Sequence, residues 1–315
     1  MHKLIVDVPN LFWRVASAHS GAYTGSTEEK AGLALHSCLT TLNKYYKQLK
    51  PDSIAVVFEG GKNWRKSYTS SDKCVSKILY KGNRIKDPSM EHLFEVLQHF
   101  EKLVREHTSI ICLQNDLVEG DDLIAGYVQH FSGDNITVLS GDKDFIQLLR
   151  HENVTLLNPD KGIPRTHENP EYFIFEKCIR GDKGDNVNSA YPNVRSKRLE
   201  KAFSDPYEMT LLMNEEWTKY NPTLDKEITY KVKDLFEENK LLMDLDCQPE
   251  DIKQTIKDTI IHGIENHGKF NLFQFNKFLG QHELNAIAKS PNSFIDMFSC
   301  TQLNKPDNKK SIIQF

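Results

Sequence analysis

The sequence predicts an α/β fold in which a central, mostly parallel β-sheet is flanked by helices. Two observations support this prediction. Short apolar runs without polar alternation recur through the first half of the chain, as is typical of buried parallel strands. Segments with the apolar period of a helix separate most of these runs, so strands and helices alternate. The five runs are KLIVDV (3–8), SIAVVFE (53–59), SIICLQ (109–114), ITVLS (136–140) and VTLLN (154–158).

The predicted helices of this first half have recognisable ends. One helix runs from about Ser26 to Leu49, with a serine or threonine as its N-cap and two glutamates in its first turn, and Pro51 separates it from the next strand. Another begins at Pro88, where proline suits a first helical turn, and is expected to cross over the sheet. A third covers residues 120–131.

The strand signal fades after residue 170. The segment 171–181 is predicted to be a helix that ends at Gly181. Residues 187–203 are expected to form a turn followed by a helix, and residues 228–289 three further helices. We therefore predict three regions, namely an α/β domain over 1–180, a helical domain over 181–289, and a C-terminal tail over 290–315.

Acidic residues recur where the predicted strands end and in the loop GDKGDN (181–186). Carboxyl ends of parallel strands share one edge of a sheet, so these acids are expected to lie together and to repel one another unless cations neutralise them. Carboxylate oxygens are the ligands that Mg²⁺ and Mn²⁺ prefer. Helix capping is the alternative, although one carboxylate would suffice for a cap. The nine predicted metal ligands are Asp7, Glu59, Glu119, Asp121, Asp122, Asp142, Asp144, Asp182 and Asp185.

Composition indicates an ordinary soluble protein. The 315 residues are 39% hydrophobic and 27% charged, and no apolar run approaches the ~20 residues of a membrane helix. The six cysteines are scattered, which argues against a zinc site or a disulfide framework. We expect no secretory leader and a cytoplasmic protein, in the host cell cytoplasm if a phage encodes it.

A basic segment, residues 60–87, interrupts the pattern. Between Gly60 and Lys86 there are eight lysines or arginines and a single acid, Asp72, together with Trp64, Tyr68 and Tyr80. It is either a solvated surface loop or a mobile arm that binds a phosphate backbone and offers aromatic rings for base stacking. An arm of this charge beside acidic ligands is what phosphodiester chemistry requires. The candidate DNA-binding cations of the arm are Lys62, Arg65, Lys66, Lys81 and Arg84.

A second basic stretch follows the GDKGDN loop. Arg195, Lys197 and Arg198 lie in the predicted turn and helix of residues 187–203. Such a turn can offer backbone N–H groups and cations to phosphates, and a charged helix face is an equally good interpretation of this segment by itself.

These motifs resemble the 5′-nuclease superfamily, which contains flap endonucleases, the 5′-nuclease domains of bacterial DNA polymerases and phage 5′-to-3′ exonucleases. The resemblance covers roughly residues 3–280, and the motifs occur in the family's order. They are IVDV, VVFE, NWRK, YKGNR, EGDD, SGDKDF and GDKGDN. The closest resemblance is to the T-even type of phage RNase H.

The resemblance implies a PIN-like 5′-nuclease fold and a two-metal phosphodiesterase that uses two Mg²⁺ ions, with Mn²⁺ as a substitute. It assigns Asp7, Glu59, Glu119, Asp121 and Asp142 to one ion, and Asp122, Asp144, Asp182 and Asp185 to the second. Lys81 and Arg84 match catalytic residues that contact the scissile phosphate, Tyr80 matches a base-stacking position, and Arg65 and Lys66 match the other limb of a basic arch. Residues 181–289 match a DNA-binding region with a helix-turn-helix-like (H3TH) element.

The chain departs from the family pattern at two points. Glu59 stands where the family usually has aspartate, and the extra methylene can shift an ion or place a water between. The DNA-binding turn, usually glycine-rich, reads SAYPNV (189–194). Glycine permits close approach of the backbone to phosphate, so duplex binding through this turn, and the monovalent ion often bound there, are both in question.

On this basis the predicted function is 5′-to-3′ exonuclease and flap endonuclease activity of the RNase H type, acting on RNA–DNA and DNA–DNA duplexes with 5′ ends, flaps or forks during phage primer removal. The alternatives are a PIN-type ribonuclease and a non-catalytic DNA-junction binding protein. We expect a monomer whose candidate partners are a sliding clamp and a single-strand DNA-binding protein. NSFIDMF (292–298) resembles a clamp-binding peptide, and packing on its own domain is an equally good interpretation.

Overall fold

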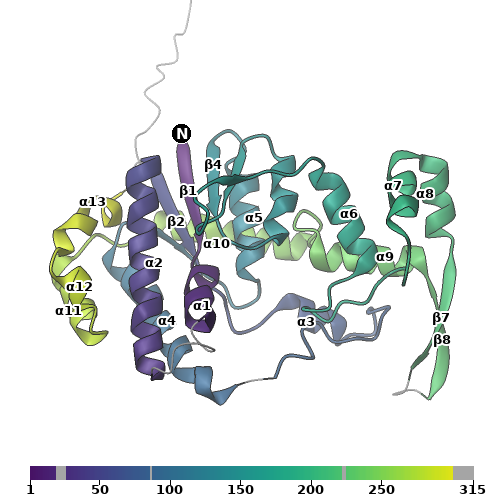
Figure 1. Ribbon diagram of the computed structural model, residues 1–315, viewed down its shortest axis with the longest axis horizontal. Helices are drawn as coiled ribbons and strands as arrows, with labels where there is room; N and C mark the ends of the chain where they lie inside the picture. The colour runs from purple at the N-terminus through teal and green to yellow at the C-terminus, as the bar shows by residue number, and fades with distance from the viewer. Residues whose placement is uncertain (19–25, 86, 222–224, 301–315) are drawn as a thin grey trace, which may run out of the picture.

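The computed structural model describes residues 1–18, 26–85, 87–221 and 225–300, and it has the predicted α/β architecture (Figure 1). In this part of the chain six strands form one sheet, in the order β3-β2-β1-β4-β5-β6. All neighbouring strands are parallel except β5 and β6, which are antiparallel. The strands are β1 (His2–Asp7), β2 (Ser53–Val57), β3 (Ile111–Leu113), β4 (Asn135–Leu139), β5 (Val154–Leu157) and β6 (Pro164–Arg165).

Helices cover both faces of this sheet, and the buried strand residues alternate between them. Leu4 and Val6 belong to one hydrophobic core, with α1, α2, α4 and α11 to α13, whereas Ile5 belongs to the other, with α5 and α10. The apolar strands are therefore buried on both sides, as their sequence pattern predicts.

The α/β region has helices close to the predicted bounds. Ser26 caps α2 through a capping box with Glu29, and Gly181, at a φ of 71°, follows α6. No helix among the described residues is long and apolar enough to cross a membrane. These elements are α1 (Val8–Ala18), α2 (Thr27–Leu49), α3 (Trp64–Thr69), the 3₁₀ turn η1 (Pro88–Met90), α4 (Glu91–His107), α5 (Gly120–His130), the 3₁₀ helix η2 (Asp144–Arg150) and α6 (Pro170–Arg180).

A smaller core lies beyond the sheet, at the opposite end of the molecule from α11 to α13 (Figure 1). It is formed by α6, α7 (Ser196–Ser204), α8 (Pro206–Met213), α9 (Val232–Met243) and a two-stranded hairpin of β7 (Glu216–Asn221) and β8 (Lys226–Lys231). The prediction that a helix begins at about residue 228 is therefore wrong for its first turn, because β8 extends to Lys231 and α9 begins at Val232. Thr229 pairs with Thr218, and the ring of Trp217 packs on Tyr230 at 5.1 Å, so alternation of aromatic and β-branched residues overrides the helical pattern here.

The last helices return to the sheet. They are α10 (Glu250–Glu265), α11 (Leu272–Gln281), α12 (Asn285–Ala288), the 3₁₀ turn η3 (Pro291–Phe294) and α13 (Ile295–Phe298). Helix α10 packs so closely on α5 that a Cβ added at Gly126 would lie 2.2 Å from Ile256 Cγ2. This packing differs from the predicted division, which placed residues 181–289 in a separate helical domain.

The segment NSFIDMF does not form an exposed peptide. Phe294, Met297 and Phe298 are buried in the same core as β1 and α2, and the backbone N–H of Ser109 donates to the carbonyl of Phe298 at 2.7 Å. The prediction that residues 292–298 bind a sliding clamp is therefore wrong, because their apolar side chains already pack on the chain's own core. Residues 301–315 of the predicted tail lie outside the described part.

The burial of the C-terminal segment predicts that Phe298→Ala destabilises the fold. Phe298 is fully buried, and truncation of a buried phenylalanine costs about 3–5 kcal/mol. Phe273→Ala is the matched control, because Phe273 is 73% exposed. Urea unfolding should show a lower midpoint for the Phe298 variant alone. Equal midpoints for both variants would contradict the packing of this segment.

Candidate active site

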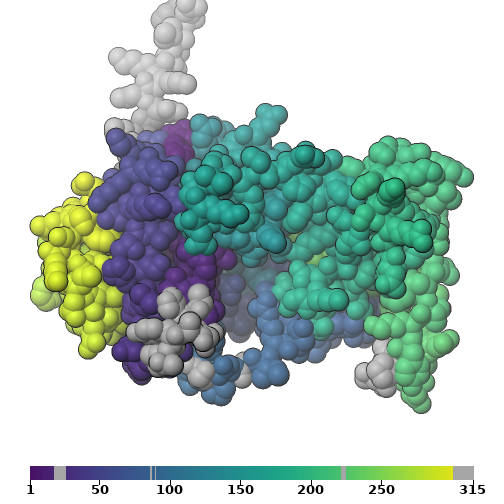
Figure 2. All heavy atoms as spheres, in the orientation of Figure 1, coloured from purple at the N-terminus to yellow at the C-terminus, as the bar shows by residue number. Residues whose placement is uncertain are grey.

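The acidic strand ends open into a cavity of about 770 Å³ at the carboxyl edge of the sheet. Figure 2 shows the surface hollowed where the purple N-terminal segment, the blue segment and the teal segment meet. Seven of the nine predicted ligands line the cavity; they are Asp7, Glu59, Asp121, Asp142, Asp144, Asp182 and Asp185. The parallel register explains this, since β1, β2 and β4 all end at this edge.

Four of these acids, Asp7, Glu59, Asp121 and Asp142, form no ion pair with a basic side chain among the described residues, although Lys81 and Arg84 lie near enough to Glu59 to oppose the rise of its pKa that burial causes. Asp7 accepts hydrogen bonds from the Ser140 hydroxyl at 2.8 Å and from the backbone N–H of Asn10 at 3.1 Å, and neither donor carries a charge. Burial and the nearby acids Asp142 and Glu59 raise the pKa of Asp7 to about 7. Burial, then Asp7 and Asp142, raise the pKa of Asp121 well above its ordinary value. Full ionisation of these acids is therefore unfavourable in the protein alone, and a cation beside them would favour their charged forms.

Two further acids of the cavity, Asp144 and Asp182, share one lysine. Lys177 Nζ lies 2.5 Å from Asp144 and 3.1 Å from Asp182. Burial raises the pKa of Asp144 although Lys177 opposes the effect, whereas Lys177 outweighs burial at Asp182 and lowers its pKa. Sequence reasoning missed Lys177. The available signal was a lysine one turn before the end of the helix that leads directly into GDKGDN.

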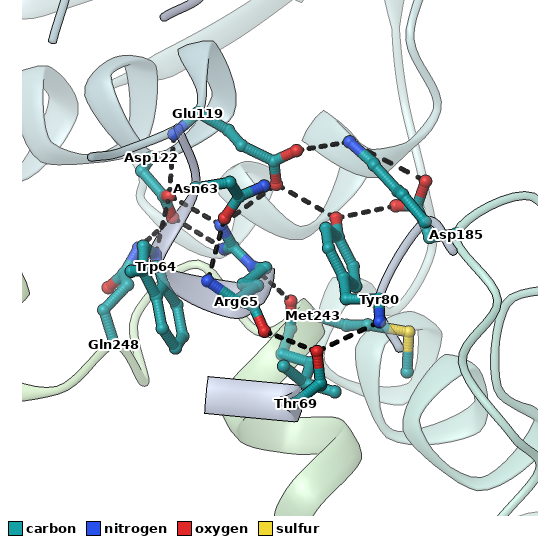
Figure 3. A network of polar contacts seen from close by, with 12 residues as sticks. Asn63, Trp64, Arg65, Thr69, Tyr80, Glu119, Asp122, Asp185, Met243 and Gln248 are labelled. Atoms are coloured by element: carbon teal, nitrogen blue, oxygen red, sulfur yellow. Dashed lines mark hydrogen bonds and ion pairs between the residues drawn. The ribbon is translucent and has the colours of Figure 1, made fainter. Parts of the chain in front are cut away.

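Lys81 and Arg84 reach the cavity from the basic segment. Lys81 Nζ binds Glu119 Oε1 and lies 3.8 Å from Asp185, and Arg84 donates to Asp185 at 2.8 Å. Arg84 remains 59% exposed. The hydroxyl of Tyr80 lies 2.9 Å from a carboxylate oxygen of Glu119 and 2.9 Å from one of Asp185, so its single hydrogen is shared between the two acids (Figure 3). The structure therefore brings the two predicted catalytic cations against two of the predicted metal ligands.

Asp122 and Arg65 form a buried pair that does not line the cavity (Figure 3). The guanidinium of Arg65 donates to both carboxylate oxygens of Asp122, at 2.6 and 2.7 Å, while the Trp64 indole and the Gln248 amide donate to the same carboxylate. Burial acts against the charge of Asp122, but Arg65 prevails and lowers its pKa. The carboxylate is 0% exposed, so its prediction as a metal ligand is wrong.

The same contacts exclude Arg65 from DNA. Its side chain is 2% exposed and also donates from Nε to the carbonyl of Leu242 at 2.7 Å. Four of the five N–H donors of this guanidinium are bonded within the protein, and almost none of its surface is open to a phosphate, so the prediction that Arg65 binds DNA is wrong. Tyr80 is likewise only 4% exposed. Its ring cannot stack on a base in this conformation, and its function here is to hold Glu119 and Asp185.

Two other predicted cations of the arm do face solvent. Lys62 and Lys66 are exposed, and with Lys81 and Arg84 they line a smaller cavity of about 200 Å³ beside Glu59. Glu59 lies at the junction, since it lines both cavities. Lys81 and Arg84 also line both cavities, so the smaller, basic cavity adjoins the acidic one, and we call it the basic entrance.

The basic turn at 187–201 lies apart from the acidic cavity and lines no part of it. Arg195 and Lys197 are exposed, whereas Arg198 binds Glu215 and donates to the Tyr191 hydroxyl at 3.0 Å. Asn193 adopts a φ of 60°, a conformation that asparagine tolerates better than most residues and that glycine would supply in a glycine-rich turn.

The chemistry of the donor set fits hard divalent cations, although the side chains are not arranged as a closed coordination shell. Among the described residues no three Asp, Glu, His or Cys side chains are grouped so that they could hold an ion. Glu119, Asp144, Asp182 and Asp185 are engaged by lysine or arginine instead. Asp7, Asp121 and Asp142 have no such basic partner among the described residues, and a cation beside them would favour their ionised forms.

Comparison with known proteins shows related chains. The chain is 25% identical over 260 residues to ribonuclease H of Enterobacteria phage T4, which covers 73% of this chain and 78% of that protein. It also matches bacterial DNA polymerases I such as that of Streptococcus pneumoniae, at 28% identity over 167 residues, and spans only 18% of the length of that polymerase.

Solved structures of a bacteriophage T5 protein share the fold. One, co-crystallised with metal ions, has a TM-score of 0.60 at 19% identity, and another, a flap endonuclease complex with DNA and metal ions, has a TM-score of 0.57 at 18% identity. Each covers 84% of this chain and 99% of the T5 chain. The family model described as 5′-3′ exonuclease, N-terminal resolvase-like domain, matches residues 2–178, more than half of the sequence. With the acidic strand ends of the same region, this match shows that the chain belongs to the 5′-3′ exonuclease family.

Proposed function

We propose that this protein is a metal-dependent 5′-nuclease that hydrolyses phosphodiester bonds at 5′ ends or flaps of RNA–DNA and DNA–DNA duplexes. The observation that carries the proposal is that Asp7, Asp121 and Asp142 line one cavity without a basic partner among the described residues, and that a cavity lined by lysine and arginine adjoins it. Acids in this arrangement attract cations, and cations are what a phosphodiester needs in order to approach them.

Two Mg²⁺ ions are the proposed cofactor, with Mn²⁺ as a substitute. Asp7, Asp121 and Asp142 hold the first ion with help from Glu59 and Glu119, and Asp144, Asp182 and Asp185 hold the second. When bound, such a pair supplies an activated water and neutralises the charge that develops on the leaving 3′-oxygen.

The chain's own cations do the remaining work. Lys81 and Arg84 now neutralise Glu119 and Asp185, and a phosphate that enters from the side of Lys62 and Lys66 offers them a competing anion. Lys81 is partly buried, so its interaction with a phosphate is screened less by water than that of an exposed lysine. The two residues therefore orient the scissile phosphate and stabilise its transition-state charge.

Substrate and partners are proposed from the same features. The named relatives are a ribonuclease H and DNA polymerases, and the T5 flap endonuclease binds DNA, which supports primer removal in phage DNA replication. The exposed Arg195 and Lys197 are the proposed contacts to the duplex. A monomer, cytoplasmic location and recruitment by a sliding clamp or a single-strand DNA-binding protein remain predictions, the clamp now without the peptide at 292–298.

The proposal predicts that Asp142→Asn reduces cleavage of a 5′-labelled flap or RNA–DNA primer hybrid by about 100-fold or more, since a ligand charge is lost. Binding of the same DNA should remain, because Asp142 does not belong to the basic entrance. Cleavage by the wild-type protein should stop in EDTA. We therefore expect cleavage by the wild-type protein to depend on metal and cleavage by Asp142→Asn to be nearly absent. No metal-dependent cleavage on any such substrate would favour the non-catalytic binding protein.

Metal binding is also predicted to show itself without any substrate. Mg²⁺ or Mn²⁺ should raise the melting temperature of the wild type, because an ion at about 100 times its Kd contributes about 2.7 kcal/mol to stability. Asp121→Asn should remove the part of this response that comes from the first ion, and it should melt higher than the wild type in EDTA, since it removes a carboxyl whose charge is opposed by burial and by Asp7 and Asp142. Glu152→Gln, at an exposed glutamate, is the control and should behave like the wild type. An unchanged metal response in Asp121→Asn would contradict its assignment.

A further inference from the structure

Glu238 on α9 is a buried carboxylate that the proposed chemistry does not use. It is 3% exposed. Its oxygens accept hydrogen bonds from two consecutive backbone N–H groups of the basic segment, those of Val75 and of Ser76, the latter at 3.0 Å. We call these two hydrogen bonds the Glu238 anchor. The anchor joins α9 to the middle of residues 60–87, at sequence separations of 163 and 162 residues.

The two hydrogen bonds to Val75 and Ser76 are the main interactions that stabilise the buried carboxylate of Glu238. No lysine, arginine or histidine among the described residues pairs with it within 4.0 Å, so the two N–H groups are its principal compensation. The carboxylate of Glu238 also acts on the nearby Tyr68, because burial, and after it Glu238, raise the pKa of Tyr68 to about 12. A buried carboxylate that receives two aligned N–H groups holds the backbone at that point strongly.

The basic segment is consequently folded against the body and is not the free arm that its composition suggests. Its first limb is held by Arg65, which donates to the carbonyl of Leu242 on α9. Its last limb is held by the backbone N–H of Lys81, which donates to the carbonyl of Asp185 at 2.8 Å. Thr69 and Tyr80 join the two limbs through the Thr69 hydroxyl. Glu238 fixes the loop between these limbs, where the chain has no regular secondary structure.

We propose that Glu238 is a positioning residue that keeps the basic segment in the conformation in which Lys81 and Arg84 face the acidic cavity. This inference rests on the proposed function and deepens it. Glu238 lines neither cavity, and its printed hydrogen bonds go to Val75 and Ser76, so its effect on substrate passes through the segment 70–80. Loss of the anchor leaves the cations present but lowers the fraction of molecules in which they are in place, and the apparent affinity for substrate falls by that fraction.

The first test is hydrogen exchange in Glu238→Gln, with Glu237→Gln as the matched control. Glu237 is the preceding residue of the same helix and is exposed. The glutamine keeps the size of the side chain, but its NH₂ group faces a backbone donor, so one of the two bonds is lost. We expect the amides of Val75 and Ser76 to exchange about tenfold faster or more in the Glu238 variant, with unchanged exchange in β1 and β4. Equal exchange at both amides in the two variants would overturn the inference.

The second test separates positioning from general destabilisation by steady-state cleavage of a 5′-flap DNA with Mg²⁺. We expect KM to rise about tenfold in Glu238→Gln with a smaller change in kcat, because bound substrate helps to restore the segment. A fall in kcat at constant KM, or faster exchange throughout the sheet, indicates a purely structural role and overturns the inference. Faster exchange of the Val75 and Ser76 amides with a wild-type KM overturns the positioning role of Glu238 but leaves the proposed function intact. Absence of cleavage by the wild type itself refutes the proposed function, and the positioning role with it.

Discussion

Repulsion between carboxylates at one edge of the sheet is the constraint on which the rest of this structure depends. Parallel strands bring their carboxyl ends together, and this chain places acids at nearly every one of them. A fold with that arrangement must supply positive charge from elsewhere. It does so from three directions, with Arg65 and Lys81 of the basic segment and Lys177 of α6, and it leaves Asp7, Asp121 and Asp142 without such a basic partner among the described residues.

The basic segment therefore has two electrostatic functions that its composition does not distinguish. Arg65 is buried and paired within the protein, where it neutralises Asp122 and joins α3 to α9. Lys62 and Lys66 face solvent, and Lys81 and Arg84 lie between these extremes, paired with acids but within reach of the cavity. Cations close together in the sequence thus differ in their availability to a ligand, and only burial and hydrogen bonding separate them.

The sheet, and the gathering of seven of the nine acids around one cavity, could be predicted from the sequence because one rule covers both, namely that buried parallel strands are continuously apolar and end at a common edge. Asp122 and Arg65 could not be assigned in this way. Asp122 follows Asp121 directly, and the helical turn of about 100° between them sends one carboxylate into the cavity and the other into the protein. The hairpin β7–β8 was missed, and the burial of Phe298 was only one of two interpretations, because short amphipathic segments have the same pattern whether they form a strand, a packed turn or a docking peptide.

The return of residues 294–298 to the core of β1 and α2 has a consequence for how this chain is made. Cys300 lies against the carbonyls of Pro51 and Asp52, and Phe298 accepts a hydrogen bond from Ser109, so the N-terminal sheet is completed by nearly the last described residues. Contacts of such long sequence separation slow folding, because the loop between them must close first. On the ribosome the N-terminal region emerges long before its final helical cover. Until then, part of the apolar surface of α2 and α4 is open to solvent and to chaperones.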